Sequence, residues 1–176
     1  MLYVQQSLTP GEELVHVGHF HWMYTARAFM GILWGLLGCI AVIYATIYIK
    51  GHFFGGFSSP TTLGMIQEIH PGIRLGAFMV LIFGLLHFAS MMVIRATTEM
   101  AVTTSRIVYK RGLVARNVGE MSIDRIEGIN VLQTIGGRLL GYGRLMIRGM
   151  GVGEVVLPEM ADPIAFRRAI EKARMS

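Results

Sequence analysis

The stretch AFMGILWGLLGCIAVIYATIYI, from Ala28 to Ile49, holds 22 residues without a charge between Arg27 and Lys50. A helix rises about 1.5 Å per residue, so a stretch of this length crosses a hydrocarbon core of about 30 Å. A second uncharged stretch of 20 residues, LGAFMVLIFGLLHFASMMVI, runs from Leu75 to Ile94. The sequence therefore predicts two transmembrane helices, at 28–49 and 75–94.

The composition agrees with a small membrane protein. Of the 176 residues, 53% are hydrophobic and 15% are charged, whereas a soluble domain carries about 25% charged residues. Such apolar content excludes a mainly disordered chain, and the single Cys39 excludes an internal disulfide scaffold. We therefore expect a membrane protein with one compact part in water.

Lysine and arginine are distributed unevenly about the two predicted spans. Only Arg27 precedes the first span and only Lys50 and Arg74 lie between the spans, whereas the other 13 of the 16 basic residues follow the second. Basic residues near the ends of spans favour the cytoplasmic side. We therefore expect both termini in the cytoplasm and the loop 50–74 outside it. The same bias accounts for the net charge of +5, so that charge does not point to nucleic acid.

Residues 1–27 are predicted to be a cytoplasmic interfacial segment. The sequence from Leu14 to Trp22, LVHVGHFHW, is amphipathic and aromatic. Trp22 and Tyr24 suit the headgroup region, where amphipathic rings concentrate. Thr9-Pro10-Gly11-Glu12 has the spacing of a helix capping box, but glycines disfavour a helix in this segment.

Residues 95–176 are expected to form a small cytoplasmic domain of antiparallel strands closed by a helix. Short β-forming runs with turn signals between them lie at 99–103, 106–111, 114–122, 126–133, 142–148 and 154–157. Asp162 and Pro163 mark a helix start. The apolar side chains that follow share one helical face: Phe166, Ala169, Ile170 and Ala173. The predicted architecture is a curled or barrel-like sheet with this helix packed on it.

Several motifs follow one another in order over most of the chain. They are TSRIVYKRGL at 104–113, IDRI at 123–126, VLQT at 131–134, GRLLGYG at 137–143 and the Asp162-Pro163 pair. Pro10-Gly11-Glu12 and His21-Trp22 stand ahead of the first span. From about Pro10 to Phe166 the chain resembles the bacterial pleckstrin-homology (PH) domain family, in its membrane-flanked two-span group, formerly a domain of unknown function. GRLLGYG is the most specific of these motifs, and the loop from Gly51 to Ile73 is longer than that group leads us to expect.

The resemblance implies a two-helix transmembrane hairpin followed by a small PH-like antiparallel β-barrel or split sheet, capped by a C-terminal helix. It implies a protein of the bacterial inner membrane with no catalytic residues and no cofactor, because PH-like domains are binding and scaffolding modules. We expect a non-enzymatic scaffold or accessory subunit of a membrane protein complex, or a homo-oligomer, with anionic lipid as a secondary ligand. A lipid-sensing or envelope-stress module is an alternative, since fold analogy alone does not establish function.

Three surfaces are candidates for contact with a partner or with lipid. Gly31 and Gly35 form a GxxxG motif on the first span, which permits close approach of either the second span or another subunit. Phenylalanines gather in the loop between the spans, where apolar content needs cover: Phe53, Phe54 and Phe57. Basic residues that can attract anionic lipid flank a turn of the predicted sheet: Lys110, Arg111 and Arg116.

Histidines are the candidates for a metal or haem site. His16, His19 and His21 lie close in sequence, and His87 lies inside the second predicted span. No nearby Cys, Asp or Glu completes a tetrahedral ligand set, so we expect no metal site. A second hypothesis makes the protein a redox membrane subunit that carries haem or metal on these histidines. For catalysis, residues 95–176 contain no histidine that could serve as the base of a nucleophile.

Overall fold

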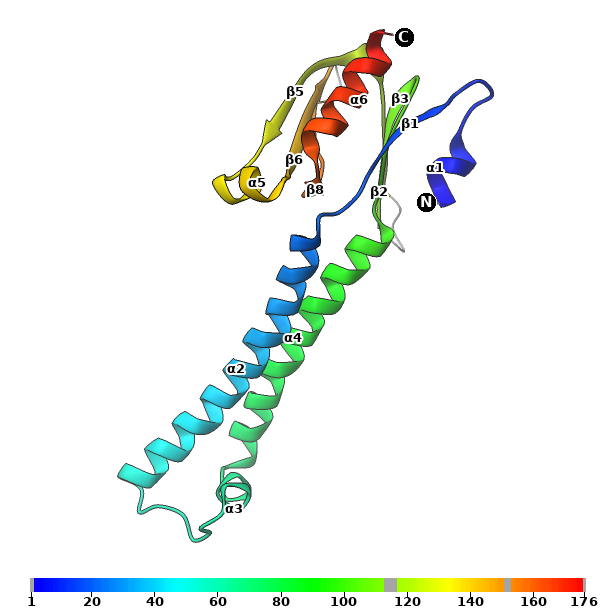
Figure 1. Ribbon diagram of the computed structural model, residues 1–176. Helices are drawn as coiled ribbons and strands as arrows, with labels where there is room; N and C mark the ends of the chain where they lie inside the picture. Colours follow the sequence, from blue (N-terminus) through cyan, green and yellow to red (C-terminus); the bar gives the residue numbers. More distant parts are fainter. Residues whose placement is uncertain (1, 113–116, 151–152, 176) are drawn as a thin grey trace. The chain divides into compact units, whose positions relative to one another are not determined.

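The chain forms two compact units in this computed structural model, which describes residues 2–112, 117–150 and 153–175 (Figure 1). Unit 1 combines Met1–Tyr24 with Val93–Ser176, and unit 2 is Thr25–Met92. Unit 1 therefore takes its residues from both sides of unit 2 in the sequence.

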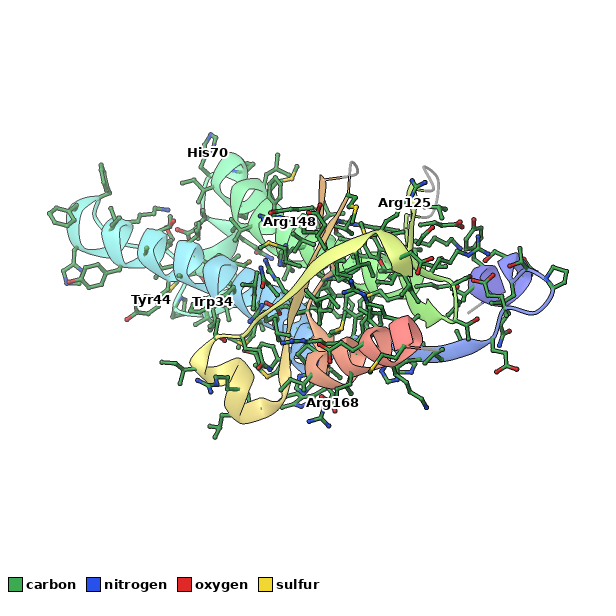
Figure 2. All side chains as sticks on the ribbon, turned by 90° about the horizontal axis from the view of Figure 1, so that it is seen from above. Trp34, Tyr44, His70, Arg125, Arg148 and Arg168 are labelled. Carbon is green, nitrogen blue, oxygen red and sulfur yellow. The ribbon has the colours of Figure 1, made fainter. Side chains whose placement is uncertain are left out.

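Unit 2 is built from two long apolar helices joined through a short one. α2 (Trp22–Phe53) and α4 (Pro71–Thr97) are long and apolar enough to cross a membrane, and each contains one of the predicted spans. α3 (Thr62–Gln67) lies in the connection between them. Aromatic side chains such as Trp34 and Tyr44 stand on the surface of α2, 66% and 69% exposed (Figure 2). An apolar surface of this extent calls for an apolar environment.

Glycines let α2 and α4 approach closely at one point. A Cβ added to Gly84 would lie 2.6 Å from the carbonyl oxygen of Gly31 and 2.9 Å from the Cα of Gly35. A Cβ added to Gly31 would lie 2.8 Å from Cδ2 of His87. The GxxxG motif therefore packs against the second long helix, which is one of the two alternatives left open by the sequence.

The strands of unit 1 form two separate antiparallel sheets. The first sheet, in the order β1-β2-β3-β4, consists of β1 (Leu14–Gly18), β2 (Glu99–Thr103), β3 (Arg106–Arg111) and β4 (Asn117–Ser122). The second, in the order β5-β6-β7 with β8 on β6, consists of β5 (Ile126–Leu132), β6 (Tyr142–Gly149), β7 (Gly153–Val156) and β8 (Met160–Ala161). A 3-10 turn, η1 (Ile123–Arg125), leads from the first sheet to the second. The split-sheet fold that the resemblance implied is confirmed, although residues 114–116 of the predicted third run lie outside the described residues.

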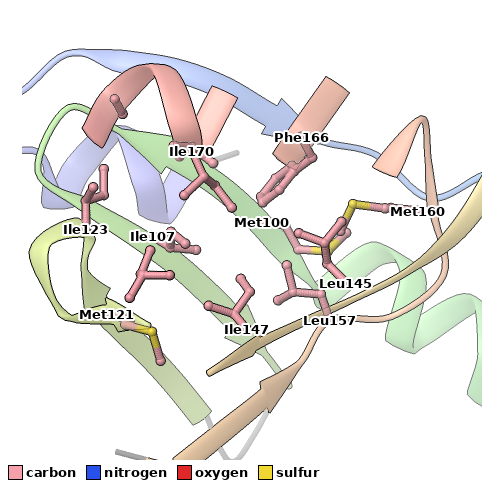
Figure 3. Close-up of a cluster of buried hydrophobic side chains, with 13 residues drawn as sticks. Met100, Ile107, Met121, Ile123, Leu145, Ile147, Leu157, Met160, Phe166 and Ile170 are labelled. Atoms are coloured by element: carbon pink, nitrogen blue, oxygen red, sulfur yellow. The ribbon is translucent and has the colours of Figure 1, made fainter. Parts of the chain in front are cut away.

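The C-terminal helix α6 (Pro163–Met175) begins where the sequence predicts. Oδ1 of Asp162 accepts a hydrogen bond from the N–H of Ala165 at 3.1 Å, as an N-cap residue does. The predicted apolar face of α6 is buried in a core lined by both sheets (Figure 3). The buried members of this core are Met100, Val102, Ile107, Met121, Ile123, Ile126, Leu145, Ile147, Leu157, Met160, Phe166, Ile170 and Ala173.

β1 shows that part of the segment before α2 belongs to the first sheet. It pairs antiparallel with β2, with Gly18 opposite Met100. A Cβ on Gly18 would lie 3.0 Å from the ring of Phe166, so the small residue lets α6 pack against this strand. A strand is not predicted from the sequence in residues 1–27, which are expected at the membrane interface. Contact of this segment with the interface stays a prediction.

Two short helices of unit 1, like α3 in unit 2, were also not predicted. α5 (Ile135–Leu140) connects β5 with β6 inside the GRLLGYG region. α1 (Leu2–Ser7) covers the outer face of the first sheet, where Tyr3 and Val4 pack with Ala101 and Val108. This cover explains why β2 is buried from Met100 to Thr103, although alternate residues of a strand point to opposite faces.

We predict that Gly84→Val destabilises the helix pair, because its branched side chain cannot fit against the backbone of α2. The expected cost is about 1–3 kcal/mol, as for other overpacked positions. The measurement is the loss of helical circular dichroism in mixed micelles of rising SDS content. Gly76→Val is the matched control on α4, since a Cβ there meets no atom within 4 Å. If Gly84→Val and Gly76→Val lost helical circular dichroism at the same SDS content, the close contact of Gly84 with α2 would not be what stabilises the helix pair.

Candidate interaction sites

The carboxylate of Glu12 holds the N-terminal segment onto the first sheet. Its Oε1 accepts hydrogen bonds from the hydroxyls of Thr103 (2.6 Å) and Ser105 (2.9 Å) and from Nε of Arg106 (3.0 Å). Its Oε2 accepts from the N–H (2.9 Å) and hydroxyl (2.6 Å) of Thr9 and from Nη2 of Arg106 (2.9 Å). Arg106 thus binds both carboxylate oxygens, the geometry of a strong charge-assisted pair.

This ion pair is nearly closed to water, with 2% of the Glu12 side chain and 22% of the Arg106 side chain exposed. Burial alone would raise the pKa of Glu12, but the hydrogen bonds from Thr103, Thr9 and Ser105 outweigh it and hold that pKa well below its ordinary value. Burial alone would lower the pKa of Arg106, but its hydrogen bonds and charge interactions with Glu12 and Glu120 outweigh burial and raise that pKa above its ordinary value. Both groups are therefore charged at neutral pH.

The Thr9-Pro10-Gly11-Glu12 segment is a tight turn and does not begin a helix. The N–H of Glu12 donates to the carbonyl of Thr9 at 2.9 Å, and Gly11 has φ +88°, as in a type II turn with proline in its second position. The side chain of Glu12 still reaches back to the N–H of Thr9, so the capping-box spacing indicated a real local contact. Arg106 lies 94 residues further along the chain, and no sequence signal joined it to Glu12.

A groove of about 220 Å³ lies between β5 and α6. β5 is an end strand of its sheet among the described strands, so one of its edges has no neighbouring strand there. The buried Ile126 and Ile170 line the groove, together with the Arg167–Glu171 ion pair (2.8 Å). A Cβ on Gly128 of β5 would meet no atom within 4 Å. An extended peptide is the ligand that such an edge can accept as an added strand.

Sequence analysis did not single out the groove. Its apolar lining belongs to the ordinary core pattern of β5 and α6. The open Gly128 within an apolar run was the one signal that could have drawn attention to it.

The predicted basic surface is only partly available. Lys110 lies 3.7 Å from the carboxylate of Glu99 and 5.1 Å from the ring centroid of Tyr3, so it helps to hold α1 on the sheet. Arg111 is exposed at the end of β3. Arg116 lies outside the described residues. Lipid binding by this group stays a prediction.

The phenylalanines of the predicted aromatic cluster in the loop differ in their exposure to solvent. Phe53 and Phe54 are 77% and 74% exposed. The ring of Phe57 is half-buried with Nζ of Lys50 at 4.4 Å from its centroid, and Lys50 also pairs with Glu68 at 3.5 Å. Phe54 lines a pocket of about 720 Å³ that also includes Ile69, His70 and Arg74. Binding of a partner by these phenylalanines stays a prediction.

The three N-terminal histidines lie in different surroundings. His16, in β1, makes an edge-to-face contact with the ring of Phe166 at 5.7 Å. His21 stacks on Tyr142 at 5.2 Å and accepts a hydrogen bond from the N–H of residue 23. His19 is exposed, and its carbonyl accepts a hydrogen bond from β8. The structure therefore gives each of them separate neighbours.

His87 stands exposed on α4 beside Gly31. Within residues 2–112, 117–150 and 153–175, no three His, Cys, Asp or Glu side chains lie close enough together to hold a metal ion. The redox hypothesis stays a prediction, and an absorbance spectrum of the purified protein tests it through the presence or absence of a Soret band.

Two long apolar helices, a split pair of antiparallel sheets and a C-terminal helix in the core define a PH-like module with a helical hairpin inserted near its start. A family model described as "Bacterial PH domain" matches residues 17–174, and the chain belongs to this family. The match includes both long helices, the strands β2 to β8 and the end of β1. PH-like domains of this kind are generally not enzymes. The searches of curated proteins and of solved structures gave no match.

We predict that Glu12→Gln lowers the free energy of unfolding of unit 1 by about 2 kcal/mol at neutral pH, because a charged hydrogen-bond network is lost. A lowered pKa stabilises the folded state above the ordinary glutamate value of about 4.3, and this stabilisation is lost as the pH falls below it. The wild-type chain should therefore lose stability on acidification more steeply than the variant.

The measurement is urea unfolding of the full chain in mild detergent, followed by Trp22 fluorescence in a Trp34→Phe background. Glu13→Gln is the control, since Glu13 is exposed and its hydrogen bonds with Thr104 use only its backbone atoms. If the control and Glu12→Gln behave alike at pH 7 and pH 4, the ion pair does not hold the segment in place.

Proposed function

We propose that this protein is a non-enzymatic scaffold or accessory subunit of a membrane protein complex in the bacterial inner membrane. Its two long helices anchor it, and its PH-like domain binds an extended segment of a partner protein at the groove between β5 and α6. Anionic lipid is a secondary ligand. The free edge of β5 beside that groove is the observation that carries the proposal.

Membrane anchorage is supported by the surface of the helix pair. Large apolar side chains are exposed along both helices, among them Phe29 (57%), Phe83 (70%) and Leu86 (58%). Leaving them in water is unfavourable by about 25 cal/mol per Å² of apolar area, whereas a hydrocarbon core removes the penalty. The excess of basic residues after the second helix supports cytoplasmic termini.

Peptide binding is supported by the backbone of β5. An added strand can pair with its open edge, so main-chain hydrogen bonds supply affinity while side-chain pockets supply specificity. The Arg167–Glu171 pair presents both charge signs at the groove, and its side chains are 48% and 46% exposed. This arrangement suits a segment of mixed charge with an apolar residue directed at the groove.

Secondary lipid contact is supported by the basic residues of β3. Arg111 is exposed at the end of β3, and a basic residue near an anionic membrane surface contributes about 1 kcal/mol. Lys110 contributes less, because Glu99 already neutralises part of its charge at 3.7 Å. Lipid attraction therefore supplements the anchor and does not replace the partner.

The predicted orientation can be tested with single cysteines in a Cys39→Ser background. In intact cells we expect a membrane-impermeant maleimide to label Ser58→Cys in the loop and not Met175→Cys, because the basic flanks hold the C-terminus inside. Both sites are exposed, and both should react after the cells are opened. Labelling of position 175 in intact cells would overturn the cytoplasmic placement.

The partner site can be tested with Gly128→Phe, which adds a bulky side chain at an open position of β5 in the lining of the groove. Cells expressing the tagged chain are extracted in mild detergent, and co-purifying proteins are quantified by mass spectrometry. We expect a stoichiometric membrane protein with the wild type and its loss, tenfold or more, with the variant, about 1.4 kcal/mol of binding energy. Gly119→Phe on β4 is the control, because Gly119 is also exposed and a Cβ there makes only ordinary contact at 3.8 Å. A wild type that purifies alone would refute the subunit role.

A further inference from the structure

The short helix α5 presents apolar side chains almost completely to solvent. Ile135 is 91% exposed and Leu139 is 86% exposed, more than any other large apolar side chain in the described part of the chain. Four residues apart, they share one face of the helix. Leu132 and Leu140 beside them are 47% and 43% exposed. Such a cluster on a folded domain indicates a surface that is covered in the working protein.

These side chains are carried by a well-fixed element. Oγ1 of Thr134 accepts a hydrogen bond from the N–H of Gly137 at 3.1 Å, which caps the start of α5. Gly141 ends the helix with φ +75°, a conformation that glycine adopts without strain. A Cβ on Gly137 would lie 2.6 Å from the carbonyl oxygen of Tyr142, so α5 lies tightly against the start of β6.

Contacts within unit 1 place α5 at the end where the chain leaves for α2. Tyr142, the first residue of β6 after the Gly141 cap of α5, stacks on His21, with ring centroids 5.2 Å apart. Trp22, which follows His21, is the first residue of α2. Ala161 pairs with Tyr142 in β8–β6, and its N–H donates to the carbonyl of His19 at 2.8 Å. Figure 1 shows α5 and β8 at the same end of the domain.

We propose that Ile135 and Leu139 insert into the interfacial layer of the bilayer that α2 enters, making α5 a third membrane contact of the protein. This inference rests on the membrane anchorage proposed above. A bilayer is the occupant that the position favours, because α5 adjoins residues one step from a membrane-spanning helix. Trp22, 60% exposed at the same end of unit 1, suits the same layer. Arg138 is exposed on α5 and suits the phosphates of anionic lipid.

The test uses the full chain with a single cysteine in a Cys39→Ser background, labelled with an environment-sensitive fluorophore. The probe positions are Leu139→Cys on α5, Phe83→Cys on α4 and Met175→Cys at the end of α6. Met175 is a matched control, since it is 83% exposed and lies about 18 Å along α6 from Pro163. The protein is reconstituted in phosphatidylcholine–phosphatidylglycerol vesicles with and without acyl chains that carry a quencher.

Insertion by about 5–10 Å predicts quenching at position 139 that is at least about half of that at position 83, with none at position 175. Quenching at 83 with 139 behaving like 175 would overturn the inference and leave the anchorage intact. Absence of quenching at all three positions would instead refute the anchorage. A blue shift at 139 without lipid quenching would show that a second copy of the chain covers α5, and would also overturn the inference.

Discussion

The part-buried ion pair between Glu12 and Arg106 is the constraint on which the domain depends. Removing two charges from water costs several kcal/mol per ion, and only a well-formed set of hydrogen bonds offsets this cost. Here the carboxylate accepts from Thr9, Thr103, Ser105 and Arg106, with both of its oxygens used. The pair positions the turn that precedes β1, so β1 can add to the first sheet and complete the surface against which Phe166 packs.

The pairing of β1 with β2 shows where the helical hairpin is inserted into the small β domain. β1 and β2 are antiparallel neighbours, with Gly18 opposite Met100 at the end where the chain leaves one strand and returns to the other. In most hairpins a few residues join such strands, whereas here the connection contains α2, α3 and α4.

The sequence predicted the elements that have a strong period or a clear start and missed those that lack one. The two long helices, the strands from Glu99 to Val156 and the Asp162 cap all carried such signals, whereas the two-residue β8 was not predicted. β1 did not, because a register shift between Leu14 and His16 interrupts its alternation, and His16 and Gly18 lie beside Phe166 where apolar side chains would be expected. Arg106 was noticed only as part of a motif, since a contact between residues 94 positions apart leaves no mark in a single sequence.

The candidate sites likewise divide into features that the sequence signals and features that it does not. The GxxxG contact could be predicted as close packing, but its partner Gly84 could not, because two spans and an outside subunit offer similar small residues. The exposure of α5 could not be predicted either. Leucine and isoleucine near a strand end are ordinarily core residues, and only their surroundings show that Ile135 and Leu139 point away from it.

β5 connects the two surfaces on which the proposals depend. The strand begins at Ile126 in the groove beside α6 and ends at Leu132, next to α5. Seven residues at about 3.3 Å each span about 20 Å, so with α5 in the membrane interface the groove lies no further than that distance from the bilayer. A peptide that adds to the free edge of β5 runs alongside this strand, between the groove and α5. A segment directly flanking a partner's own membrane span can reach a site at that distance, which agrees with the membrane partner proposed above.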